Sequence, residues 1–169
     1  MRIRRFVAVC SALVVCVPAL AGAQDTRKIG ITMGYPASVG LLWHATESVA
    51  IRPAITFTHA SSDRIPVDSW SFGLDLGALF YVKKYDNVRT YISPRFSYTR
   101  TSSSVTPTGS DLTSHSTGGI GAFGTQFAAS QRFSVYGEVG ISVSRRTAEF
   151  GGKGTTWGTA AGVGIVFYP

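Results

Sequence analysis

Histidine and serine lie close together at two places in the chain, and nucleophilic catalysis uses this pair of residues. His59 and Ser61 are separated by one alanine, and His115 directly precedes Ser116. A serine nucleophile needs a histidine base, and the histidine needs a carboxylate that orients it. Asp63 follows too closely to orient His59 from a separate strand. Because such pairs are common by chance, we do not predict a catalytic triad.

Four isolated charges form a second set of candidate residues, each placed on the polar side of an alternating segment. These residues are Arg52, Asp75, Arg95 and Glu138. They have two interpretations, which are a carboxylate pair for acid–base chemistry and a buried ion network that fills an interior. No set of histidine and acidic residues has the spacing of a metal site, and we expect no metal and no cofactor. The choice between the two interpretations depends on where the strands that carry these charges place them.

The first 23 residues are predicted to be a secretory signal peptide that is cleaved. Three arginines within the first five residues precede an apolar run, which closes on Ala21-Gly22-Ala23. The run of about 15 residues is too short for a membrane-spanning helix. Cys10 and Cys16 both lie in this segment and lack the small preceding residue of a bacterial lipid-attachment site. The mature chain therefore has no cysteine and forms no disulfide.

Residues 24–169 are predicted to form a single domain. Removal of the signal peptide takes away three arginines and no acidic residue, so the formal net charge falls from +7 to +4. The remaining cations form no concentrated patch, which gives no support for nucleic-acid binding. The chain has 19 glycines and sparse charge, and no mature segment has an amphipathic helical stripe. This composition indicates a β-rich protein.

Alternation of apolar and polar residues recurs in eight segments, which predicts eight β-strands. The predicted strands cover residues 28–35, 39–45, 49–59, 70–83, 88–100, 118–129, 133–144 and 156–168. The sixth strand is the least regular, because its glycines obscure the alternation and would allow a bulge. An even number of strands places both termini at the same end of the fold.

The predicted connections also alternate in length. Residues 45–48, 84–87 and 130–132 form short polar connections. Residues 60–69, 101–117 and 145–156 form longer ones, rich in serine, threonine, glycine and aspartate as loops are. The first hairpin, from Pro36 to Ser38, is short where this rhythm calls for a long loop. A surface partner would bind at the long loops, above all at the Ser/Thr-rich loop 101–117.

Two fold classes fit the alternation, which are a soluble sandwich with its apolar face inward and a membrane barrel with its apolar face outward. The polar faces carry glycine, alanine, serine, threonine and a few charges, which suit the crowded interior of a narrow barrel. Aromatic residues near strand ends suggest the girdles of a membrane barrel, namely Tyr35, Trp43, Trp70, Tyr98, Trp157 and Phe167. We therefore predict an all-β fold, an eight-stranded antiparallel up-and-down transmembrane β-barrel with its apolar face outward.

The chain resembles the eight-stranded outer-membrane β-barrels typified by outer-membrane protein A and its X-type relatives. The resemblance covers nearly all of Lys28 to Tyr168 and rests on the strand rhythm, the loop alternation, the glycine-rich strands and the terminal aromatic residue. It implies a bacterial outer-membrane location, contact with outer-membrane lipids and lipopolysaccharide, and insertion by the barrel-assembly machinery. It also implies a monomer with a structural or surface-interaction role, such as envelope integrity or adhesion, and no catalytic site.

Within such a barrel, the four isolated charges would form an interior ion network. Asp75 and Arg95 would lie nearly opposite one another, and Glu138 would reach across to Arg52 or Arg95. The last strand would pair with the first to close the barrel, with Val163, Ile165 and Phe167 facing lipid. Arg145, Arg146 and Lys153 make the last long loop basic, and this loop could contact lipopolysaccharide phosphates.

Two alternative functions stay open. Some small outer-membrane barrels are enzymes that act on lipid A, and the His-x-Ser pair of such deacylases resembles His59-Ala60-Ser61. However, Ser62 replaces the asparagine that follows the serine in those enzymes, and Asp75 would face inward. The other alternative is a soluble periplasmic β-barrel that binds a lipophilic ligand. A wide pore is not expected, because aqueous channels belong to barrels of about 16 strands or more.

Overall fold

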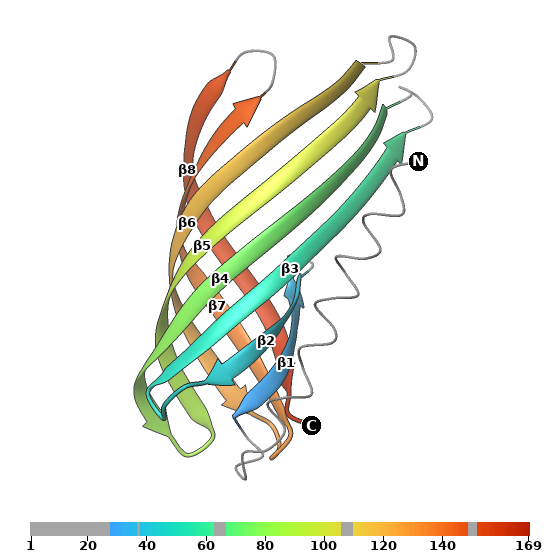
Figure 1. The fold of residues 1–169 in the computed structure, drawn as a ribbon. Helices are drawn as coiled ribbons and strands as arrows, with labels where there is room; N and C mark the ends of the chain where they lie inside the picture. Colours follow the sequence, from blue (N-terminus) through green and yellow to red (C-terminus); the bar gives the residue numbers. More distant parts are fainter. Residues whose placement is uncertain (1–27, 37, 63–66, 106–109, 149–151) are drawn as a thin grey trace.

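The computed structural model describes residues 28–36, 38–62, 67–105, 110–148 and 152–169, so the predicted signal peptide lies outside the described residues. Eight strands form one closed ring in the order of the sequence (Figure 1). The strands are β1 (Ile29–Tyr35), β2 (Ser38–His44), β3 (Val49–Ser62), β4 (Val67–Tyr85), β5 (Val88–Val105), β6 (Ser110–Ala128), β7 (Phe133–Ala148) and β8 (Lys153–Phe167). Among the residues described, no helix is long and apolar enough to cross a membrane.

Every strand pairs in antiparallel fashion with its neighbours in the chain, and β1 pairs with β8 to close the ring. A row of paired residues can be followed once around the barrel. The row starts at Thr155 on β8, passes through Tyr98 and Val39, and returns to β8 at Ile165, ten residues farther along the strand. This displacement in an eight-stranded ring corresponds to a strand tilt of about 40°. Figure 1 shows the steeply inclined strands.

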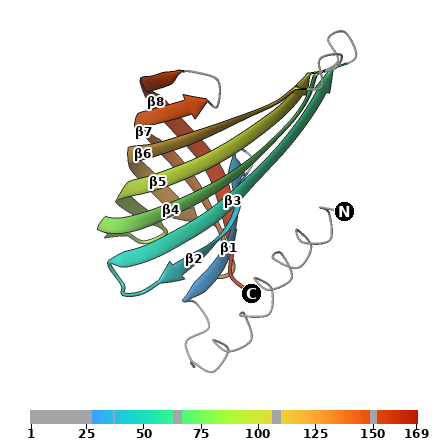
Figure 2. The same ribbon diagram turned by 45° about the horizontal axis from the view of Figure 1, so that its top comes forward.

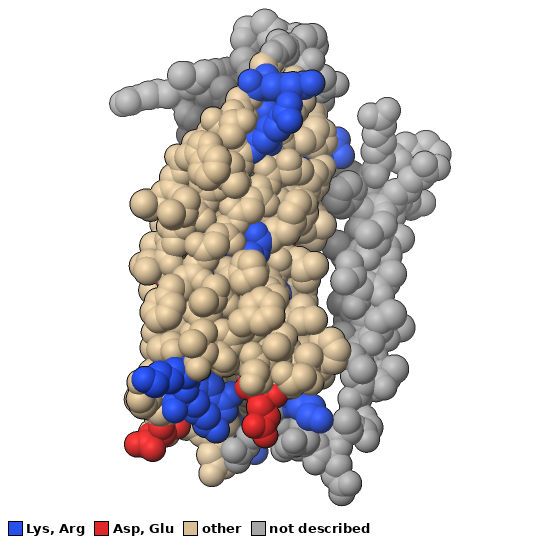
Figure 3. All heavy atoms as spheres, turned by 90° about the vertical axis from the view of Figure 1, so that its left-hand side faces the viewer, with Lys and Arg blue, Asp and Glu red and all other residues tan. Residues whose placement is uncertain are grey.

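The apolar side chains point away from the barrel axis. On β7, Val139 and Ile141 are 63% and 64% exposed, whereas Glu138 on the opposite face is 6% exposed. The space-filling view shows a broad surface with almost no charge between one basic end and one end of mixed charge (Figure 3). A folded protein normally buries most of its large apolar residues. The predicted eight-stranded antiparallel barrel with an outward apolar face is confirmed.

The interior is packed most tightly at the end that holds the start of β1 and the end of β8. Leu42, Leu79, Tyr91, Val166 and Tyr168 are buried there and contact one another as the apolar core. A barrel of eight strands is just wide enough for side chains to fill it. These residues therefore close the lumen at this end.

The strands extend into the segments that were predicted to be long loops, so those predictions were wrong. β5 continues to Val105 and β6 begins at Ser110, and most of segment 101–117 is therefore a paired hairpin. β3, β4, β7 and β8 lengthen in the same way. Threonine has a high strand propensity, and cross-strand hydroxyl pairs such as Ser71 with Thr101 (3.1 Å) stabilise neighbouring strands. A polar segment can thus continue a strand beyond the apolar belt.

The irregular register lies in β4 instead of β6. β6 pairs continuously with both neighbours, and its even-numbered residues, such as Ala122 and Gln126, point into the barrel. The pairing of β4 with β5 shifts between Tyr81 and Lys83, which marks a β-bulge. Strict alternation from the inward Tyr81 would point Lys83 into the barrel. The bulge turns Lys83 toward the outside, where its ammonium lies 5.0 Å from the centre of the Tyr85 ring.

The first hairpin is much shorter than its neighbours. β1 and β2 have 7 residues each, whereas β3 has 14 and β8 has 15. The pairing of β1 with β8 ends at Tyr35 opposite Val163, and the pairing of β2 with β3 ends at Val39 opposite Ile55. Residues 56–62 of β3 and 153–162 of β8 therefore have unpaired facing edges within the described chain. We call the space between these two edges the notch, and Figure 2 shows the short β1 and β2 beside the long β3.

Candidate functional site

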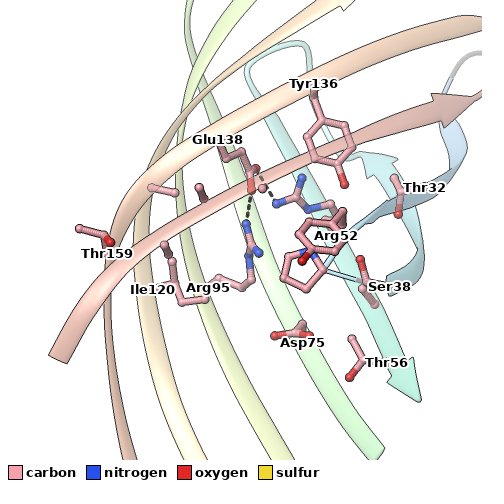
Figure 4. Close-up of a pocket in the computed structure, with 17 residues that line it drawn as sticks. Thr32, Ser38, Arg52, Thr56, Asp75, Arg95, Ile120, Tyr136, Glu138 and Thr159 are labelled. Atoms are coloured by element: carbon pink, nitrogen blue, oxygen red, sulfur yellow. Dashed lines mark hydrogen bonds and ion pairs between the residues drawn. The ribbon is translucent and has the colours of Figure 1, made fainter. Parts of the chain in front are cut away.

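Glu138 is the centre of an ionic cluster inside the barrel. Its Oε1 atom accepts hydrogen bonds from Arg52 Nη2 at 2.6 Å and from the Tyr91 hydroxyl at 2.9 Å. Its Oε2 atom accepts a hydrogen bond from Arg95 Nη2. Figure 4 shows both arginines reaching the same carboxylate from different strands. We call these four residues the ionic cluster.

The ionic cluster joins strands that are not neighbours in the barrel. Arg52 lies on β3, Tyr91 and Arg95 on β5, and Glu138 on β7. Charge-assisted hydrogen bonds of this kind are stronger than neutral ones, and removal of one partner from a buried pair is costly. The Arg52 guanidinium also lies 5.0 Å from the centre of the Tyr136 ring. The cluster therefore ties opposite walls together and obstructs the middle of the lumen.

Asp75 does not join the ionic cluster, although the sequence placed it opposite Arg95. The register pairs Asp75 with Ser97 and Arg95 with Gly77, which is two residues away along β4. Within the described residues, the ion pairs of Glu138 involve Arg52 and Arg95, and Asp75 has no ion pair within 4.0 Å. The structure thus brings together three of the four predicted charges and leaves the fourth apart.

A cavity of about 320 Å³ lies beside the ionic cluster, and Arg52, Arg95 and Glu138 form part of its wall. Asp75 faces the same cavity from β4 (Figure 4). The rest of the wall consists mainly of small or hydroxyl-bearing residues, namely Thr32, Ser38, Ala54, Thr56, Ala122, Thr159, Ala160, Ala161 and Gly162, with Tyr35, Pro36, Ile120 and Tyr136. The cavity therefore combines a charged base with walls that leave room for a ligand.

His59 has a carboxylate partner that the sequence did not predict. Its Nε2 atom lies 2.7 Å from Asp68 Oδ1, and both side chains are more than half exposed. Ser61 is paired with Asp68 across the β3–β4 ladder, so all three residues lie at the same edge of the barrel. The sequence did not reveal Asp68 as a partner because segment 60–69 is predicted to be a loop. The structure shows no hydrogen bond between Ser61 and His59 in the described chain, so the arrangement is an incomplete triad.

The two other histidines have tyrosine partners. His115 Nδ1 lies 2.8 Å from the Tyr98 hydroxyl on the exposed surface. His44 Nε2 lies 3.1 Å from the Tyr168 hydroxyl in the packed end of the lumen, where Gln126 Nε2 also donates to that hydroxyl at 3.2 Å. Among the described residues, no group of three histidine, cysteine or acidic residues could hold a metal ion.

The predicted girdle residues occupy two levels and the space between them. Trp43 and Phe167 lie toward the end that holds the start of β1 and the end of β8, and Trp70 and Trp157 lie toward the opposite end. Ten residues of tilted strand separate Trp157 from Phe167, which corresponds to about 26 Å along the barrel axis. Tyr35 is paired with Val163, near the middle of this span, so it belongs to neither level.

The three predicted lipopolysaccharide contacts do not form one patch. Arg146 is exposed, but it has the inward parity of Glu138 on β7, and its Nη2 atom donates to Ser114 Oγ at 3.0 Å. Arg145 and Lys153 are exposed and have the outward parity of Val139 and Trp157 on their strands. Arg100 is also exposed on the outer surface of β5, near the level of Arg145. The sequence missed Arg100 because it lies on another hairpin.

Comparison with known proteins gives a similarity of fold. No family model and no curated protein sequence matches the chain. The crystal structure of Neisserial surface protein A matches with a TM-score of 0.55 and 14% identity, over 83% of this chain and 93% of that chain. The crystal structure of a major outer membrane protein from Thermus thermophilus matches with a TM-score of 0.54 and 11% identity, over 83% of this chain and 98% of that chain. The resemblance expected from the sequence is confirmed at the level of the fold, and the chain has the architecture of small outer-membrane β-barrels.

Proposed function

We propose that the chain is an integral protein of a bacterial outer membrane and that its barrel has a structural or surface-interaction role. The observation that carries this proposal is the outward apolar surface on a closed ring of strands. Its span of about 26 Å agrees with the apolar band of about 25 Å of transmembrane barrels. A membrane accepts β-structure when its backbone groups are paired, and the pairing of β1 with β8 from Ile31 to Tyr35 closes the barrel on the side of the notch that holds the start of β1.

The lumen supports a structural role instead of transport through the barrel. The ionic cluster crosses the middle of the barrel, and the apolar core fills the end that holds the start of β1 and the end of β8. These side chains leave no wide aqueous path through the described part of the barrel. We therefore propose a monomeric barrel whose contacts with other molecules lie on its surface.

Lipopolysaccharide and the outer-membrane lipids are the proposed surface partners. Arg100, Arg145 and Lys153 are exposed near the level of Trp70 and Trp157, at one end of the apolar belt. Guanidinium and ammonium groups form strong charge-assisted hydrogen bonds with phosphate. The closed antiparallel barrel is also the ground on which we propose insertion by the barrel-assembly machinery.

Carbonate extraction of membranes tests the location. We expect the protein to remain in the membrane pellet after extraction at high pH and to show a heat-dependent gel mobility, because a closed barrel resists unfolding by detergent. A matched periplasmic protein serves as the control for release. Recovery of the protein in the soluble fraction would contradict the proposal and would favour a soluble barrel.

A second candidate function is hydrolysis of a lipid ester at the outer surface, and the His59–Asp68 contact favours it. In this reaction the Ser61 hydroxyl would attack the ester carbonyl while His59 takes the hydroxyl proton. The intermediate would expel the alcohol, which receives that proton, and water would then hydrolyse the acyl-serine to release the fatty acid. Mass spectrometry of lipid A from cells with and without the protein tests the activity. A loss of acyl chains that is abolished by His59→Ala and retained by the control His115→Ala would support the enzyme. An unchanged lipid A spectrum would exclude lipid A as its substrate.

A further inference from the structure

We infer that the barrel wall is open sideways at the notch and that the cavity behind it binds a single-chain lipid with an aminophosphate headgroup. The inference rests on the proposed location, because a lateral opening can admit a lipid only if the barrel lies in a membrane. The four observations behind it concern the height of the notch, its polar edges, the position of the cavity and the distribution of charge.

The notch lies in one half of the apolar belt. The first hairpin ends where Tyr35 pairs with Val163, and Trp157 marks the far end of the belt on β8. Six residues of tilted strand separate Val163 from Trp157, which corresponds to about 16 Å along the barrel axis. The hairpin therefore ends near the middle of the membrane. The long hairpins lie opposite the end that holds the start of β1 and the end of β8. Because outer-membrane barrels carry their longer connections on the extracellular side, the notch faces the outer leaflet.

The edges of the notch are polar, although the surrounding wall is apolar. Residues 56–62 of β3 and 153–162 of β8 turn unpaired backbone groups toward it within the described chain. Such groups are costly in hydrocarbon and require water or another polar partner. Because β1 and β2 do not extend to this level, three strand spacings, or about 14 Å, separate the two edges. A hydrated gap of this width allows a polar headgroup to pass through a wall that otherwise excludes it.

The cavity lies directly behind the notch. Tyr35, Pro36 and Ser38 line it from the tip of the first hairpin, and residues 159–162 line it from the unpaired edge of β8. Its volume of about 320 Å³ is at the lower end of the range of ligand pockets. A headgroup fits this space, whereas the hydrocarbon chain would leave through the notch and lie in the lipid.

The charges of the cavity favour a headgroup that carries both signs. Arg52 and Arg95 balance Glu138 and Asp75, so a neutral zwitterion enters without adding net charge. Asp75 has no ion pair in the described chain, and in Figure 4 it lies away from the dashed contacts of Glu138. Its carboxylate can therefore receive an ammonium group. Arg95 lines the cavity and its side chain is 22% exposed, so its guanidinium can donate to a phosphate oxygen.

Native mass spectrometry of residues 24–169 in a non-ionic detergent tests the inference. The probes are lysophosphatidylethanolamine and lysophosphatidylglycerol with the same hydrocarbon chain. We expect a one-to-one adduct with the ethanolamine lipid and binding of the glycerol lipid about tenfold weaker, because the latter lacks the ammonium group. Asp75→Asn should reduce the preference for the ethanolamine lipid to near one. This variant conserves the shape of the side chain and leaves the ionic cluster intact.

A second pair of variants tests the cavity itself. Ala160→Phe fills the cavity from β8 and should weaken the adduct about tenfold or more, whereas Ala78→Phe adds the same bulk on β4 and should leave it unchanged. Retained gel mobility shows that each variant is folded. Equal binding to Ala160→Phe and to the original chain, equal binding of both lipids, or a stable dimer in place of the adduct would overturn the inference. A protein that pellets with membranes but binds no probe would refute this inference and leave the proposed location standing.

Discussion

Replacement of Glu138 by glutamine should destabilise the barrel strongly. The substitution keeps the shape of the side chain but removes the charge that pairs with Arg52 and Arg95. Glu138 is 6% exposed, so both guanidinium groups would lose their counter-charge in a region with little water. Breaking a buried ion pair costs about 3–5 kcal/mol. We expect a loss of about 4 kcal/mol in the free energy of unfolding, which is close to a thousandfold change in the equilibrium constant.

Urea unfolding of the barrel in lipid vesicles, followed by gel mobility and tryptophan fluorescence, measures this loss. Asp75→Asn is the matched control, because Asp75 forms no ion pair within 4.0 Å in the described chain, and it should destabilise the barrel clearly less than Glu138→Gln does. The double variant Glu138→Gln with Arg95→Gln should be more stable than the sum of the single effects predicts. An unfolding free energy for Glu138→Gln within about 1 kcal/mol of the original would refute the structural role of the ionic cluster.

Three further predictions concern packing, the chain end and the surface. Gly124→Ala should slow or reduce folding into vesicles, because an added Cβ would meet the Tyr91 ring, whereas Gly121→Ala meets no atom within 4 Å and should fold normally. Tyr168→Phe should lower the urea midpoint by the equivalent of about 1–2 kcal/mol, because His44 and Gln126 lose their hydroxyl partner. Arg145→Ala should weaken binding to lipopolysaccharide vesicles in a salt-dependent way and more than Arg146→Ala, because the Arg146 guanidinium is held by Ser114.

The sequence predicted the faces of the strands well, because a period of two is a local property. Residues such as Glu138 and Val139 differ by one position, and the apolar belt fixes which of them must face lipid. Arg52 and Arg95 were predicted as alternative partners of Glu138 for the same reason, since parity placed these charges in one narrow interior, whereas Tyr91 was not predicted. The predicted position of Asp75 opposite Arg95 was wrong by two residues. Cross-strand neighbours depend on the register of the hairpin, which the hairpin length alone did not determine.

The sequence predicted the strand ends and the outer surface less well. Serine and threonine suit both loops and strands, so nothing local showed that β5 extends to Val105. The same uncertainty hid Asp68, which contacts His59 once β4 begins at Val67. The short hairpin at Pro36 was visible in the sequence as a break in the rhythm of the loops. Its consequence, the notch between β3 and β8, required the pairing of the whole ring.

A cysteine scan of β7 tests most directly whether the outward apolar face contacts lipid. Residues 24–169 contain no cysteine, so a single fluorophore can be attached in turn at positions 139, 140, 141 and 142. With vesicles that carry a nitroxide on the lipid chain, we predict strong quenching at Val139 and Ile141, and weak quenching at Gly140 and Ser142, which face the interior. Equal quenching at all four positions, or stronger quenching at Gly140 and Ser142, would contradict the account.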